Sequence, residues 1–146
     1  MIKKEKTLFF YNTSSFYFPQ RNKLKRFIRS LCKKEKQEIE EIRIIFSEKK
    51  EIRNINKKFL SHDYDTDIIT FPFSYPKEPI EAELYINIPV VRRQAIDFNC
   101  SFKEELHRII FHGILHLCGY NDKSEKEKVQ MREKENFYLN LYFNNQ

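Results

Sequence analysis

Four short stretches of the chain have the apolar composition of β-strands, and one of them, residues 41–46, also alternates hydrophobic and polar residues with a period of two. They span residues 7–11, 41–46, 67–73 and 83–88, and all four are rich in β-branched and aromatic side chains. The proline-containing sequence FSYPKEP, which joins the third stretch to the fourth, is typical of a turn or loop. The pattern therefore predicts a small sheet of about four strands.

About five helices are predicted between these strands or after them. After Pro19, the apolar residues Leu24, Phe27, Ile28 and Leu31 have the i, i+3, i+4, i+7 spacing of one buried helix face. The other helices are predicted from start signals: a capping serine, an early proline, or a serine followed three residues later by glutamate. These signals are Ser47, Pro89, Ser101 with Glu104, and Ser124 with Glu127.

Together these elements predict an α+β or α/β fold, with helices packed on a small sheet in a single domain of residues 1–146. No apolar run approaches the roughly 20 residues that a membrane-spanning helix needs. The N-terminus has no signal-peptide pattern, and three cysteines at unrelated spacings indicate free thiols rather than a disulfide framework. We therefore expect a cytoplasmic protein without a membrane anchor.

Positive charge is concentrated near the N-terminus. Residues 1–36 hold eleven of the 27 lysines and arginines and only two acidic residues, so this quarter carries +9 and the remainder −3. Clustered cations bind polyanions by releasing counterions from phosphates, although a solvated basic surface without any partner is the alternative interpretation. Four cations that fall together beside the apolar stripe of the first helix are the candidate contacts: Lys25, Arg29, Lys33 and Lys36.

Three of the four histidines lie within ten residues, on the helix predicted after Ser101. His112 and His116 are one turn apart, so their side chains project from the same helix face. Gly119 is suited to end the helix with a positive φ, after which the returning chain would bring Asp122 to the same point. Zinc enzymes with three protein ligands and an open position use this arrangement. We expect these three residues to bind one metal ion, the alternative being a hydrogen-bonded histidine pair in the core.

Three further residues of the same helix refine this hypothesis. Arg108 lies one turn before His112, where a cation would hold a phosphate or a developing oxyanion. His107 is about 140° around the helix from His112 and is expected to support the site or to face solvent. Zinc peptidases place a glutamate directly after the first histidine as general base, whereas this chain has Gly113 there. The sequence therefore disfavours a peptidase.

The sequence HGILHLCGYND at residues 112–122 resembles the HGxLHLxGYDH signature of the YbeY family, the bacterial rRNA maturation endoribonucleases. Upstream, Asn56, Phe59 and residues 63–72 are similar to the family stretch N-x-x-Y-R-x-x-D-x-x-T-D-V-L-S-F-P. Ala82 and Glu83 stand where the family has G-D-I-x-I. The resemblance covers about residues 52–135, which is more than half of the chain.

This resemblance implies a zincin-like α+β fold, a mixed sheet of about four strands with about five helices, and one Zn²⁺ ion on His112, His116 and residue 122. It implies metal-dependent cleavage of single-stranded RNA in 16S rRNA 3′-end maturation and ribosome quality control, with the small ribosomal subunit as partner. The basic residues of the first helix would then hold the RNA backbone. The catalytic candidates are Arg108, for the added charge, and Glu105 and Asp67, each as general base or as a group that orients a ligand histidine.

Three positions depart from the family pattern. Asp122 replaces the usual histidine, Leu60 replaces an arginine, and Ala82-Glu83 replaces Gly-Asp. An aspartate makes a bound metal a weaker Lewis acid, and loss of the arginine removes a phosphate contact. These departures favour the alternative function, a non-catalytic, metal-stabilised ribosome-assembly or RNA-binding factor.

Overall fold

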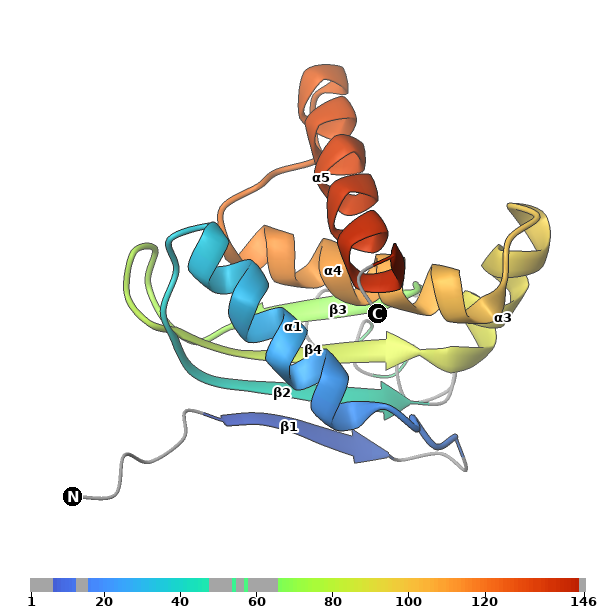
Figure 1. The fold of residues 1–146 in the computed structure, drawn as a ribbon, viewed down its shortest axis with the longest axis horizontal. Coiled ribbons are helices and arrows are strands. Elements are labelled where there is room, and N and C mark those ends of the chain that lie inside the picture. The colour runs from blue at the N-terminus through green and yellow to red at the C-terminus, as the bar shows by residue number, and fades with distance from the viewer. Residues whose placement is uncertain (1–6, 13–15, 48–53, 55–56, 58–65, 145–146) are drawn as a thin grey trace.

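A four-stranded mixed sheet forms the base of the fold (Figure 1). A computed structural model describes residues 7–12, 16–47, 54, 57 and 66–144. The strand order is β1-β2-β4-β3, with β3 antiparallel to β4 and the other neighbours parallel. All four predicted strands are confirmed: β1 (Thr7–Asn12), β2 (Ile39–Ser47), β3 (Ile68–Pro72) and β4 (Ile80–Asn87).

Four of the predicted helices are present in the described part of the chain, so the α+β fold is confirmed. The helix expected after Ser47 lies outside the described residues, apart from positions 54 and 57, which are helical. No helix of the described residues is long and apolar enough to cross a bilayer. The helices are α1 (Arg21–Lys34), α3 (Ile88–Asp97), α4 (Phe102–Leu117) and α5 (Glu125–Asn144).

The predicted capping serines begin the two helices that build the site. At α4, Ser101 Oγ accepts a hydrogen bond from the backbone N–H of Glu104 at 3.0 Å. At α5, Ser124 and Glu127 form a reciprocal pair, each backbone N–H donating to the other side chain at 2.9 and 3.1 Å. Both arrangements satisfy amide groups that have no partner inside the helix.

Helices α1 and α4 lie over the same face of the sheet, and α5 packs across them from outside (Figure 1). Gly113 of α4 faces the sheet, where a Cβ atom would lie 2.7 Å from Cδ1 of Ile68 and 3.2 Å from Leu84. A side chain at this position would require Ile68 and Leu84 to move. The position where a zinc peptidase has its general base therefore faces the apolar core in this chain.

Candidate metal centre

The structure brings together the three predicted ligands on the outer face of α4. The Nε2 atoms of His112 and His116 lie 3.0 Å apart, and each is 3.3 Å from Oδ2 of Asp122. In a tetrahedral zinc site with bonds of about 2.0–2.1 Å, two donor atoms are separated by about 3.3 Å. The spacing of this donor set therefore fits a small divalent metal ion.

A glycine turn brings the third ligand to the helix. The backbone N–H groups of Gly119 and Tyr120 donate to the carbonyls of His116 and Leu115, each at 3.0 Å, which is the Schellman pattern. Gly119 has a φ of 103°, a conformation that favours glycine. The turn also directs the Tyr120 carbonyl at His116, whose Nδ1 donates to it at 2.8 Å. His116 is thus held with Nε2 facing the metal position.

Glu135 of α5 holds the other histidine. Its Oε2 accepts from His112 Nδ1 at 2.6 Å, and the Glu135 side chain is only 6% exposed. A carboxylate behind a ligand histidine fixes the ring and makes it a stronger donor. Burial lowers the pKa of His112, but the hydrogen bond and the charges of Glu135 and Asp122 outweigh it and raise that pKa. Glu135 is not among the residues that the sequence motif predicts for the site.

Arg108 lies against this carboxylate. Its NH1 atom donates to Glu135 Oε1 at 3.1 Å and to Asn136 Oδ1 at 2.9 Å. Burial raises the pKa of Glu135, but its bonds to His112 and Arg108 dominate and lower it, so the carboxylate stays ionised. In this structure Arg108 supports the residue that orients a ligand.

The two carboxylates predicted as catalytic candidates share one hydrogen-bond donor, Gln94. Glu105 is 2% exposed, and Gln94, with its amide nitrogen turned toward the acids, donates to Glu105 at 3.2 Å and to Asp67 at 3.3 Å. Burial raises the pKa of Glu105, a shift that Arg108 opposes and Asp67 reinforces. Neither acid has a hydrogen bond to His112 or His116 in the described part of the chain, so the structure supplies no direct contact for a ligand-orienting role.

His107 belongs to the core, and the prediction that it supports the site or faces solvent is wrong. Its side chain packs against Tyr142 and Phe143, with ring centroids 4.5 and 5.1 Å away. Its Nδ1 donates to the Lys103 carbonyl at 2.6 Å. Burial lowers the pKa of His107 to about 4, so the ring is neutral at pH 7. Phe18, Tyr142 and Phe143, which surround it, come from other segments, and helical periodicity alone could not reveal them.

Comparisons with known proteins identify the family. A sequence profile described as "Endoribonuclease YbeY" matches residues 11–142. The chain belongs to the YbeY family. The endoribonuclease YbeY of Cytophaga hutchinsonii is 42% identical over 139 residues, which cover 94% of this chain and 97% of the relative. That of Chlorobium phaeovibrioides is 38% identical over 135 residues, covering 92% and 90% of the two chains.

A solved structure agrees with this assignment. The solution structure of TM1509 from Thermotoga maritima matches with a TM-score of 0.69 at 26% identity, covering 95% of this chain and 91% of that one. Members of the YbeY family are endoribonucleases and therefore hydrolases. Among the family positions that depart in this chain, Asp122 lies at the metal centre, whereas Leu60 lies outside the described residues.

Two clefts of this YbeY-family chain border the ligands. One, of about 450 Å³, is lined by His112, Asp122 and Glu135 together with Lys128 and Arg132. A second, of about 390 Å³, reaches His116 from the loop between β3 and β4. Lys128 and Arg132 are exposed cations beside the metal position, and sequence reasoning missed them because their distance from it depends on how α5 packs.

The four residues predicted to contact RNA differ in their solvent exposure. Lys33 and Lys36 are exposed, whereas Lys25 and Arg29 are half-buried. The amino group of Lys25 lies 5.8 Å from the ring of Phe10 on β1. Lys36 lies beyond α1, which ends at Lys34, and its φ is 59°, so the prediction that it shares a helix face with the other three is wrong. None of the four cations lines either cleft at the metal centre.

Proposed function

We propose that this protein is a metal-dependent endoribonuclease that cleaves single-stranded RNA, acting in the cytoplasm as one domain on ribosomal RNA of the small subunit. Its reactions would be 16S rRNA 3′-end maturation and ribosome quality control. The observation that carries the proposal is the donor set of His112, His116 and Asp122, with spacings of 3.0–3.3 Å in a chain of the YbeY family. The proposed cofactor is one Zn²⁺ ion in a zincin-like fold.

When bound, the metal ion would polarise a phosphate oxygen or lower the pKa of a water molecule. The protein supplies the orientation of the donors. Glu135 and the Tyr120 carbonyl hold Nδ1 of the two histidines, so both Nε2 lone pairs face the metal position. Asp122 is the most exposed of the three ligands, with 40% of its side chain accessible, which leaves the site open to a substrate on that side.

Cations around the site are suited to the phosphate. Lys128 and Arg132 line the cleft next to His112 and Asp122, where they would neutralise charge on the phosphodiester. Arg108 uses NH1 to hold Glu135, and its remaining N–H groups are the proposed contact for charge that develops in the transition state. Glu105 has a raised pKa and lies close to Asp67, so this acid pair is the proposed proton reservoir.

Cleavage by metal-reconstituted protein tests the proposal directly. A labelled single-stranded RNA that contains the 3′ end of 16S rRNA is incubated with protein stripped of metal, then with zinc-loaded protein. His116→Ala, purified in parallel, carries the same contaminating nucleases and is the matched control. We expect zinc-dependent cleavage that is lost in His116→Ala. Equal cleavage by both proteins would contradict catalysis, and zinc and RNA binding without cleavage would support an assembly factor instead.

The proposed backbone contacts of α1 have their own test. Replacing Lys25, Arg29, Lys33 and Lys36 by glutamine should flatten the plot of log K against log salt by up to about 3, at roughly 0.7 per phosphate contact on single strands. Fluorescence anisotropy with labelled RNA measures the slope, and circular dichroism checks the fold. An unchanged slope in a folded variant would show that these residues are only a solvated surface.

A further inference from the structure

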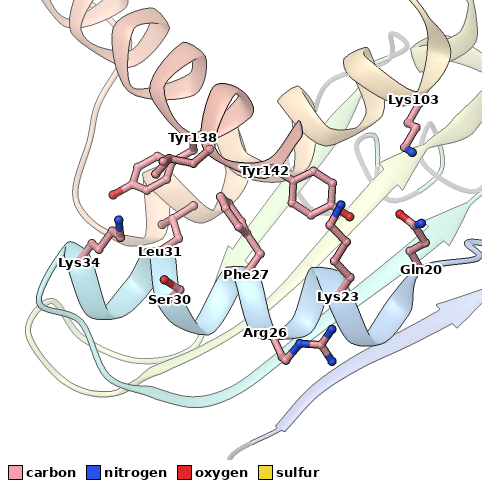
Figure 2. A pocket seen from close by; sticks show the side chains of 11 residues that line it. Gln20, Lys23, Arg26, Phe27, Ser30, Leu31, Lys34, Lys103, Tyr138 and Tyr142 are labelled. Atoms are coloured by element: carbon pink, nitrogen blue, oxygen red, sulfur yellow. The ribbon is translucent and has the colours of Figure 1, made fainter. Parts of the chain in front are cut away.

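A groove larger than either cleft at the metal centre lies between α1 and α5 (Figure 2). Its volume is about 620 Å³, within the range of small-ligand sites. Aromatic side chains of both helices form the floor, and polar side chains form the rim. In Figure 2 the amino groups of Lys23 and Lys34 rise from α1 toward α5, and Lys103 approaches from α4.

The groove carries positive charge without compensation. Its lining contains Lys23, Arg26, Lys34 and Lys103 and, among the described residues, no acidic side chain. Within the described ranges none of these four cations forms an ion pair with a carboxylate; Lys23, for example, lies 4.3 Å from the ring of Tyr142. Like charges brought together in this way repel each other, and a bound anion would relieve that repulsion.

These cations are distinct from those singled out in the sequence. At about 100° per residue, Lys23 and Lys34 fall on one side of the buried stripe of α1, and Lys25 and Arg29 fall on the other. The helix is therefore basic along both edges. The edge that faces α5 borders the groove.

An unpartnered donor lies in the wall of this groove. Tyr142 is 1% exposed, and its hydroxyl has no hydrogen-bond partner among the described residues. Buried hydroxyl groups nearly always have a partner, so this one marks a position where an acceptor is missing. The amino group of Lys23 covers the ring, and its movement toward an anion would uncover Tyr142.

A hydrogen-bonded carboxylate, Glu35, links the groove to the loop that carries Asp122. Tyr138 lines the groove and donates to Glu35 at 2.5 Å, and the same carboxylate accepts from the hydroxyl of Tyr120 at 2.5 Å. Tyr120 lies two residues before the ligand Asp122 and accepts from His116. The groove and the loop that carries Asp122 are therefore joined by side chains that share one carboxylate.

We propose that the α1–α5 groove binds the phosphodiester backbone of single-stranded RNA, as a second contact that holds the strand while another part lies at the metal centre. This proposal rests on the proposed function for the identity of the anion. The groove is better suited to bind the phosphodiester backbone than the bases of RNA. The ring of Phe27 already packs against Phe111 and Tyr142, with ring centroids 5.1 Å from each, so it is not available to stack on a base. Contacts to phosphate carry no sequence preference, so binding here should be nearly independent of base composition.

Two variants with the same net charge test the groove. Lys34→Gln/Lys103→Gln removes one cation from each wall, and Arg92→Gln/Arg93→Gln removes two exposed cations of α3 that line neither this groove nor the two clefts at the metal centre. Anisotropy of a fluorescein-labelled, 20-nucleotide single-stranded RNA is measured from 50 to 300 mM salt, with strand integrity checked on a gel. We expect the groove variant to flatten the salt slope by about 1.4 and to weaken binding at least about fivefold at 0.1 M salt. The control variant should bind within twofold of wild type.

Equal slopes for the two folded variants would overturn the proposal, because loss of net charge alone would then explain the change. A flatter slope with one RNA sequence and not with another would also overturn it, since phosphate contacts do not read bases. Cleavage is measured separately. If zinc-loaded wild type fails to cleave RNA but the salt slopes of the two variants still differ, the proposed function is contradicted and the groove proposal is supported. If wild type cleaves RNA but the slopes are equal, the proposed function is supported and the groove proposal is contradicted.

Discussion

Two histidine environments on one helix show what makes a metal ligand in this fold. His107 and His116 both donate from Nδ1 to a backbone carbonyl, so both rings carry their lone pair on Nε2. The Nε2 atom of His107 is buried with no partner in the described chain, whereas that of His116 faces His112 and Asp122. The bond at Nδ1 does not distinguish the two residues. The group that Nε2 meets decides which histidine can bind a metal ion.

The same comparison explains the role of α5. This helix delivers Tyr142 and Phe143 to His107 and Glu135 to His112. Tyr142 and Phe143, near the C-terminal end of α5, pack around His107. The carboxylate of Glu135, in the middle of α5, accepts a hydrogen bond from His112. Variants that exchange or remove these partners therefore test the contrast between the two environments.

The largest effect is expected from Glu135→Gln, which keeps the shape of the side chain and removes its charge. Zinc affinity should fall by about tenfold to a hundredfold, because His112 loses its orientation and part of its donor strength. Competition with a chromogenic chelator measures the affinity. Glu125→Gln on the same helix, where the side chain is 92% exposed, is the matched control and should bind zinc as wild type does. Equal affinities would mean that Glu135 only supports packing.

The second effect concerns the buried histidine and pH. The pKa of His107 is about 4 in the folded protein against an ordinary value of 6.5, so the unfolded state takes up more protons between these values. The contribution of neutral His107 to stability is full above pH 6.5 and is lost as pH falls toward 4. From pH 7.5 to 5 the free energy of unfolding should decrease by about 2 kcal/mol through this residue.

Denaturant unfolding of metal-free wild type and His107→Leu at pH 7.5 and pH 5 isolates this contribution. The variant has no titrating group at position 107, so its stability should decrease by about 2 kcal/mol less than that of wild type. The comparison cancels the titration of other groups, because both proteins share them. If the free energy of unfolding changed equally in both proteins between the two pH values, the His107 ring would be accessible to water and would have an ordinary pKa.

Local sequence patterns predict the strands and helices of the described residues and the three residues of the candidate metal site. An i, i+4 histidine pair and a helix-ending glycine are short-range features, so His112, His116 and Asp122 could be identified without the fold. The strand order β1-β2-β4-β3 and the packing of α5 depend on contacts between distant segments. His107 was misassigned for this reason, since its angle on α4 gave no indication of the aromatic rings that surround it.

Glu135 had a sequence signal that was overlooked. The buried residues of α5 are Met131, Glu135, Tyr138, Leu139 and Tyr142, so a carboxylate occupies a position in an otherwise apolar stripe. A charged residue at such a position is almost always paired, and the nearby histidines were the available partners. The position of Arg108 on the ligand face was correct, but its contact with Glu135 could be seen only in three dimensions.

The smallest effect is expected at the third ligand. His112 and His116 are fixed by a helix and by their Nδ1 bonds, whereas Asp122 lies in the loop after Gly119 with 40% of its side chain exposed. A loop can adjust to a longer donor, and imidazole suits zinc, so Asp122→His should bind zinc at least as well as wild type. Chelator competition measures this, and X-ray absorption should show one more imidazole in the metal shell. A loss of more than about tenfold, the scale of damage to the groups behind a ligand, would mean that Asp122 has a role other than ligation.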